Sequence, residues 1–123
     1  MVLIIGGAYQ GKLDYALDRY GLSEGDVCRC ETGGTPRGKI IYEIDKWIYR
    51  LAEAGADVEE AIRELINVNS DAVVICNDIS CGVVPVDAVQ RKWREAVSRA
   101  AVQLAGASDE VVRLFCGIPT RIK

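Results

Sequence analysis

The sequence predicts an α/β fold of three layers, in which a small, mostly parallel sheet is flanked by helices. Apolar strand-like runs alternate with helical stripes along the chain, and this alternation implies right-handed crossovers between parallel strands. The run at 72–76, Ala-Val-Val-Ile-Cys, has the unbroken apolar character of a central parallel strand. A glycine-rich segment at 6–13 joins the first strand to the first helix. We therefore expect one domain over residues 1–123, with four strands.

A phosphate-binding loop follows the first strand, which is expected at 2–5. Residues 6–13 read Gly-Gly-Ala-Tyr-Gln-Gly-Lys-Leu and contain the Gly-x4-Gly-Lys pattern between a strand and a helix. Gly6 and Gly11 suit a loop whose N–H groups surround a phosphate, because glycine reaches positive φ at little cost. Lys12 brings a mobile charge to the outer phosphates, unless the segment is only a tight turn with a solvated lysine. The residues expected to bind a nucleotide are Gly6, Gly7, Ala8, Tyr9, Gln10, Gly11, Lys12 and Leu13.

Leu13 departs from this pattern, which has Ser or Thr after the lysine. The missing hydroxyl normally ligates Mg²⁺, and leucine offers no oxygen. Either water or another residue such as Asp14 fills that position, or metal binding is weak. Leu13 also lies on the apolar face of the helix expected over 12–20, so it can simply extend that face into the core, together with Ala16, Leu17 and Tyr20.

The middle of the chain predicts one further strand and two helices. The strand is expected at 26–31, and a helix at 40–54 carries an apolar stripe that places Trp47 in the core. Asp57 is expected to cap the next helix, with Glu60 completing a capping box. The segment 32–39 is rich in Gly and Thr, and it is either a substrate loop carrying Arg37 and Lys39 or an ordinary solvated connection.

The second half predicts a carboxylate at the sheet edge and a basic helix. The strand at 72–76 ends in Asn77-Asp78, and ligands of open α/β sheets bind beyond the carboxyl ends of the strands. Asp78 is therefore the candidate catalytic and Mg²⁺-binding carboxylate, although Asn-Asp also favours a turn. Asp87 is expected to cap a helix before a last strand at 110–116 and a short tail at 117–123. That helix carries Arg91, Arg94 and Arg99. These side chains either form a solvated face or reach an anionic ligand.

Composition narrows the classes of function. The net charge of −3 gives no electrostatic case for binding nucleic acid or a membrane. No apolar run approaches transmembrane length and no basic leader precedes the first strand, so we expect a cytoplasmic protein. The five cysteines are odd in number and lack a Cys-x-x-Cys pair, which favours free thiols over a zinc site. The chain has no histidine, and this excludes histidine-based acid–base and covalent chemistry within it.

Residues 76–85, Cys-Asn-Asp-Ile-Ser-Cys-Gly-Val-Val-Pro, resemble the Asn-Glu-Val-Gly-x-Gly-Ile-Val-Pro signature of a known family. It is the adenosylcobinamide kinase / adenosylcobinamide-phosphate guanylyltransferase family of cobalamin biosynthesis. The segment 91–95, Arg-Lys-Trp-Arg-Glu, is similar to the Arg-x-Phe-Arg-Asp of that family, and Gly6 to Lys12 are similar to its loop. The last strand and the closing Arg-Ile-Lys are also similar, so the resemblance covers about 1–20 and 70–123.

The resemblance implies a phosphate-loop NTPase-like fold, a nucleotide (ATP or GTP) with Mg²⁺, a corrinoid substrate and a homo-oligomer. The implied activity is phosphorylation of adenosylcobinamide. Guanylyl transfer in the family passes through a histidine, which this chain lacks, so that reaction is excluded. The chain resembles a shortened member, and we do not find in it the family's strand that ends in an acidic residue, Cys and Thr. We expect either a kinase-like enzyme or, because of Leu13, a non-catalytic nucleotide- or corrinoid-binding relative with a regulatory or assembly role.

Overall fold

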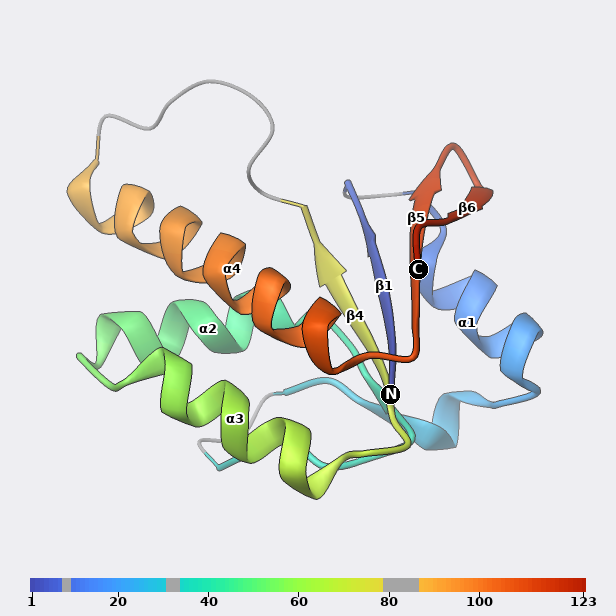
Figure 1. The fold of residues 1–123 in the computed structure, drawn as a ribbon, viewed down its shortest axis with the longest axis horizontal. Coiled ribbons are helices and arrows are strands. Elements are labelled where there is room, and N and C mark those ends of the chain that lie inside the picture. Colours follow the sequence, from blue (N-terminus) through green and yellow to red (C-terminus); the bar gives the residue numbers. More distant parts are fainter. Residues whose placement is uncertain (8–9, 31–33, 79–86) are drawn as a thin grey trace.

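The computed structural model of the chain describes residues 1–7, 10–30, 34–78 and 87–123. Within them the strands form one sheet of six, in the order β2-β3-β4-β1-β5-β6. Figure 1 labels the neighbouring strands β4, β1, β5 and β6. All neighbouring pairs are parallel except β5 and β6. The strands are β1 (Val2–Gly6), β2 (Val27–Cys28), β3 (Ile40–Ile41), β4 (Val73–Asn77), β5 (Glu110–Phe115) and β6 (Ile118–Arg121).

The helices cover both faces of this sheet, which confirms the predicted three-layer α/β fold. Helix α1 (Lys12–Tyr20) lies on one side, while α2 (Ile44–Glu53), α3 (Val58–Val68) and α4 (Ala88–Ala107) lie together on the other (Figure 1). Successive side chains of a strand point to opposite faces. Accordingly, Leu3 belongs to the buried cluster under α2–α4, and its neighbour Ile4 belongs to the cluster under α1.

The parallel pairing brings the ends of three strands to one edge of the sheet. Strand β1 pairs with β4 on one side and β5 on the other, starting from Val2 opposite Val73 and Glu110. Beyond β4, the backbone N–H of Asp78 still donates to the carbonyl of Gly6 at 2.7 Å. The loop after β1 therefore begins beside the end of β4, as expected for ligand sites in open α/β sheets.

Two glycines of the loop, Gly6 and Gly11, are required for different structural reasons. Gly11 has φ 80° and precedes α1, which confirms the expected positive φ. The expectation of a positive φ is wrong for Gly6, which is the last residue of the extended strand β1. A Cβ atom there would lie 2.5 Å from the carbonyl oxygen of Leu114, so the neighbouring backbone of β5 requires glycine at this position.

Several predicted elements are confirmed and others are corrected. The Asp57 and Asp87 side chains cap α3 and α4 by accepting hydrogen bonds from the N–H groups of Glu60 and Val89. The expected helix at 40–54 begins only at Ile44, because residues 40–41 form β3 between β2 and β4. The expected tail at 117–123 contains β6, so the sheet has six strands within the described residues rather than four.

Candidate functional site

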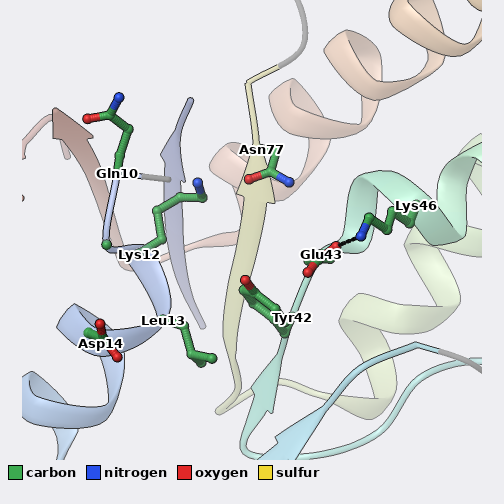
Figure 2. Close-up of a pocket in the computed structure, with 9 residues that line it drawn as sticks. Gln10, Lys12, Leu13, Asp14, Tyr42, Glu43, Lys46 and Asn77 are labelled. Carbon is green, nitrogen blue, oxygen red and sulfur yellow. Dashed lines mark ion pairs between the residues drawn. The ribbon is translucent and has the colours of Figure 1, made fainter. Parts of the chain in front are cut away.

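A cavity of about 590 Å³ lies at the carboxyl ends of β1 and β4 (Figure 2). The start of α1 forms one wall, and the residues between β3 and α2 form the opposite wall. The residues that line it are Gln10, Gly11, Lys12, Leu13, Asp14, Tyr42, Glu43, Lys46 and Asn77. Five of these lie in or directly after the predicted phosphate-binding loop, so the fold places that loop around an open space of ligand size.

Lys12 is the buried cation of this cavity. Its side chain is 5% exposed, and its ammonium donates a hydrogen bond to the Gly7 carbonyl at 2.5 Å. Burial lowers the pKa of Lys12, while the charges of Asp45, Cys76 and Glu43 raise it in part. A desolvated ammonium with one backbone acceptor retains donors for an anionic ligand. Lys12 is therefore placed to meet an anion that enters the cavity.

Gln10 connects the loop to a neighbouring strand. The Gln10 side-chain oxygen accepts a hydrogen bond from the N–H of Cys116 at the end of β5. This contact ties the loop to the neighbouring strand. Ala8 and Tyr9, which were predicted to bind the nucleotide, lie outside the described residues.

Leu13 packs into the core, as one of the two sequence interpretations expects. It is partly buried and contacts the cluster under α1, while it also borders the cavity. It supplies no oxygen for a metal. No three Cys, Asp or Glu side chains converge into a metal site within the ranges the structure describes. Mg²⁺ is usually held by one or two carboxylates and by phosphates, and the carboxylates that line the cavity are Asp14 and Glu43.

Glu43 and Lys46 form the wall opposite Lys12 (Figure 2). Glu43 has φ 57°, a left-handed conformation in which the chain turns from β3 into α2. Its carboxylate forms an ion pair with Lys46 and raises the pKa of that lysine. Lys46 is 67% exposed, so the cavity lining carries a second cation on its solvent side.

The sequence prediction missed the lining residues Tyr42, Glu43 and Lys46, and it also missed Asp45, which lies behind the cavity. The Asp45 side chain is only 3% exposed, and its oxygens accept hydrogen bonds from the backbone N–H of Asn77 at 3.2 Å and from its Nδ2 at 3.4 Å. Burial raises the pKa of Asp45, and the hydrogen bonds from Asn77 oppose that effect. A charged residue beside Ile44 on the buried side of the helix is the signal that could have revealed it, because charged side chains are rarely buried without a partner.

The other predicted site residues do not line the cavity. Asp78 follows β4 but is not among the lining residues, and its neighbour Asn77 takes that position. On α4, Arg91 is exposed and Arg94 is partly buried, and neither lines the cavity. Arg99 lines a second hollow of about 760 Å³ over α3 and α4. The cavity lining therefore combines the loop with Asn77. Asp78 lies beside the loop through its backbone hydrogen bond to Gly6 but does not line the cavity, and neither do these arginines.

The segment 32–39 does not reach this site in its described part. The carbonyl of Lys39 accepts a hydrogen bond from the N–H of Val73, where β4 begins. The Asn69 side chain holds the Pro36 carbonyl at 2.8 Å and accepts from the N–H of Gly38. Residues 34–39 therefore lie at the amino ends of the strands, at the opposite edge of the sheet from the Lys12 cavity. This position favours an ordinary connection and not a substrate loop.

Four of the five cysteines lie within the described residues. Cys28, Cys30, Cys76 and Cys116 are free thiols, and Cys81 lies outside the described residues, as does the segment 79–86. Among the helices that are described, none combines the length and the apolar character needed to cross a bilayer.

Comparisons with known proteins identify relatives of this chain. The sequence model of the family described as cobinamide kinase / cobinamide phosphate guanyltransferase matches residues 34–122. The bifunctional adenosylcobalamin biosynthesis protein CobU of Escherichia coli (strain K12) is 30% identical over 81 residues. The protein of the same description from Salmonella typhimurium (strain LT2) is 28% identical over 81 residues. Each alignment covers 64% of this chain and 45% of the relative, so the chain matches less than half the length of these proteins.

The extent of the family match corrects the sequence analysis in one respect. The resemblance was expected over about 1–20 and 70–123, whereas the match includes the middle of the chain from residue 34 onward. That middle part contains β3, which the sequence prediction had assigned to a helix. The acidic residues Glu43 and Asp45 follow β3 closely. The match begins after the loop at 6–13, which rests on its own sequence pattern and geometry. With nearly three quarters of its residues matched, the chain belongs to the cobinamide kinase / cobinamide phosphate guanyltransferase family.

Proposed function

We propose that residues 1–123 form one phosphate-loop domain that binds the phosphates of ATP or GTP in the Lys12 cavity. The observation that carries this proposal is the buried ammonium of Lys12 at the carboxyl edge of β1, facing a cavity of about 590 Å³. Backbone N–H groups at the start of α1 add the positive end of a helix to the same wall. In a member of this family, a nucleotide is the anion that best fits these features.

The reaction we propose is phosphorylation of adenosylcobinamide by the bound nucleotide, as a step in cobalamin biosynthesis. Phosphoryl transfer depends mainly on positioning and on charge stabilisation. Lys12 would contact the outer phosphates, and the backbone of Gly6 to Lys12 would surround them. Mg²⁺ would neutralise phosphate charge, and Asp14 and Glu43, the carboxylates that line the cavity, would be available to hold it. Guanylyl transfer through a histidine is excluded within these 123 residues, because they contain none.

A second candidate function is binding of a nucleotide or corrinoid without catalysis, in a regulatory or assembly role. Leu13 favours it, since the cavity lacks the hydroxyl that usually ligates Mg²⁺ after the loop lysine. The retained Lys12 and its burial favour the kinase. The kinase and the nucleotide-binding form of the second candidate share the binding step and differ in whether a phosphoryl group is transferred.

Nucleotide binding is tested by thermal unfolding with ATP or GTP, with and without Mg²⁺. A ligand at a hundred times its Kd adds about 2.7 kcal/mol to the free energy of unfolding. We expect this stabilisation to disappear in Lys12→Met. The matched control is Lys92→Met, which removes the same charge from an exposed position outside the cavity. Absence of stabilisation by any nucleotide would refute the kinase and the nucleotide-binding form of the second candidate, and would leave only corrinoid binding.

Catalysis is tested by incubating the protein with adenosylcobinamide and Mg²⁺-nucleotide and separating the products by mass. Adenosylcobinamide phosphate formed by the wild-type protein but not by Lys12→Met supports the kinase. Nucleotide binding without any phosphorylated product after prolonged incubation supports the non-catalytic candidate instead.

A further inference from the structure

Asp45 and Asn77 form a hydrogen-bonded pair behind the Lys12 cavity. Asp45 lies in the first turn of α2, and Asn77 is the last residue of β4. One Asp45 oxygen accepts from the backbone N–H of Asn77 at 3.2 Å, and the other accepts from its Nδ2 at 3.4 Å. Asp45 is buried, whereas Asn77 is partly exposed and lines the cavity. The pair therefore connects the helix to the strand end that meets a ligand.

The backbone of Asp45 is fixed independently of its carboxylate. Its carbonyl oxygen accepts a hydrogen bond from the indole N–H of Trp93 at 2.8 Å. Trp93 in turn packs edge-to-face against Tyr49 of α2, with ring centroids 5.2 Å apart. The position of the carboxylate is thus set by α2 and α4 together, which lets it orient a side chain on a third element.

This arrangement determines which end of the Asn77 amide faces the ligand. A carboxylate only accepts hydrogen bonds, so it holds the NH₂ end of the amide. The amide oxygen is then directed toward the Lys12 side of the cavity (Figure 2). If Asp45 were neutral and able to donate, the opposite orientation would be equally satisfied. The cavity consequently presents a hydrogen-bond acceptor beside a cation.

We infer that Asp45 is a positioning residue that orients the Asn77 amide so that its oxygen accepts a hydrogen bond from an O–H group of the ligand bound beside Lys12. The inference rests on the proposed nucleotide function. The O–H group belongs either to the ligand itself, as a hydroxyl, or to water bound to Mg²⁺ on its phosphates. In both cases an acceptor next to the phosphate-binding lysine selects ligands that carry such a donor.

The orientation of the amide is tested by NMR, without any ligand. In the wild-type protein one Asn77 side-chain amide proton should be shifted downfield and should exchange slowly with water. In Asp45→Asn this signature should be lost, because the new amide also satisfies Asn77 in the opposite orientation. Asp18→Asn, which removes an exposed carboxylate of α1 outside the cavity, is the matched control and should leave it unchanged. A rapidly exchanging Asn77 amide in the wild-type protein would overturn the inference even if Asp45→Asn did not fold.

The effect on the ligand is tested by calorimetry with a double-mutant cycle. We expect Asp45→Asn and Asn77→Ala each to weaken nucleotide binding about 2- to 10-fold, as for loss of one hydrogen bond. The double variant should bind no more weakly than Asn77→Ala alone, because Asp45 acts through Asn77. Additive losses, or no loss in Asn77→Ala, would overturn the inference.

Two ligands separate the sources of the O–H group. If it is water on Mg²⁺, the loss appears with inorganic triphosphate as well as ATP, and only when Mg²⁺ is present. If it is a hydroxyl of the nucleotide, the loss appears with ATP alone and persists without Mg²⁺. If the wild-type protein binds no nucleotide, the proposed function fails and the ligand part of the inference fails with it, while the NMR signature still decides whether Asp45 orients Asn77.

Discussion

Replacing Gly6 with alanine tests whether the first glycine of the loop is required by the sheet rather than by a ligand. An ideal Cβ at this position lies 2.5 Å from the carbonyl oxygen of Leu114 and 3.5 Å from its carbonyl carbon. Both atoms belong to the backbone of β5, which pairs with β1 along its length, so no flexible side chain can move aside. Forcing extra atoms into a packed interior typically costs about 1–3 kcal/mol. We expect Gly6→Ala to lower the free energy of unfolding by about 2–3 kcal/mol.

Gly7 provides the matched control in the same loop. A Cβ there would lie 3.8 Å from the Gln10 Cγ atom, an ordinary contact with a side chain. We expect Gly7→Ala to cost less than about 1 kcal/mol, in the range of mild substitutions. Both variants are measured by equilibrium urea unfolding, comparing midpoints at an unchanged m value. The reasoning is refuted if Gly6→Ala unfolds like the wild type, or if Gly7→Ala loses as much as Gly6→Ala.

Three further predictions concern the core, the pH dependence and the metal. Asn69→Ala removes side-chain hydrogen bonds to the carbonyls of Pro36 and Leu65, at 2.8 and 2.9 Å, and should cost about 2–3 kcal/mol in urea unfolding; a loss too small to measure would contradict it. Burial raises the pKa of Cys30 to about 12 from 9.0, so its stabilising contribution is complete below pH 9 and is lost as the pH rises from 9 toward 12. Between pH 9 and 11 the wild-type protein should therefore lose more stability than Cys30→Ala, by about 1.4 kcal/mol per pH unit, and equal slopes would count against this. Leu13→Ser restores a hydroxyl after Lys12, and calorimetry should show that Mg²⁺ strengthens nucleotide binding more in this variant than in the wild type; an unchanged Mg²⁺ effect would show that the hydroxyl is not what the site lacks.

The elements with long periodic patterns were predicted well from the sequence. The stripe of α1 and the aspartate caps of α3 and α4 are confirmed, because helical periodicity and capping depend on residues close together in the chain. The unbroken apolar run of β4 also indicated its central place, since a strand covered on both faces needs apolar side chains on both.

Short strands were the main failure of the sequence prediction. Ile40 and Ile41 continue the apolar stripe of α2 in sequence, so the periodicity alone assigned them to the helix. In the structure they pair with β2 and β4, and Glu43 in the left-handed conformation separates them from the helix. Two residues are too few to show the alternation of a strand, and the pairing depends on segments distant in the chain.

The sequence predicted the part of the candidate site that is local in the chain and missed the part that depends on contacts between distant segments. The loop lies within one stretch of sequence, so its motif announces it, and Lys12 faces the cavity as expected. The contact between Asp45 and Asn77 behind the cavity could not be predicted, because it forms only through the packing of α2 against β4. Asp78 was chosen because it follows a strand, but of these two neighbours the structure turns Asn77 toward the cavity.

The most direct test of the central claim is the thermal midpoint of the wild-type protein and Lys12→Met with saturating Mg²⁺-ATP or Mg²⁺-GTP. For a chain of 123 residues, stabilisation by about 2.7 kcal/mol corresponds to a rise of about 10 °C. We expect this rise in the wild-type protein and in Lys92→Met, and none in Lys12→Met. An equal rise in Lys12→Met would show that the nucleotide binds elsewhere, and no rise in the wild-type protein would contradict a nucleotide site in the Lys12 cavity.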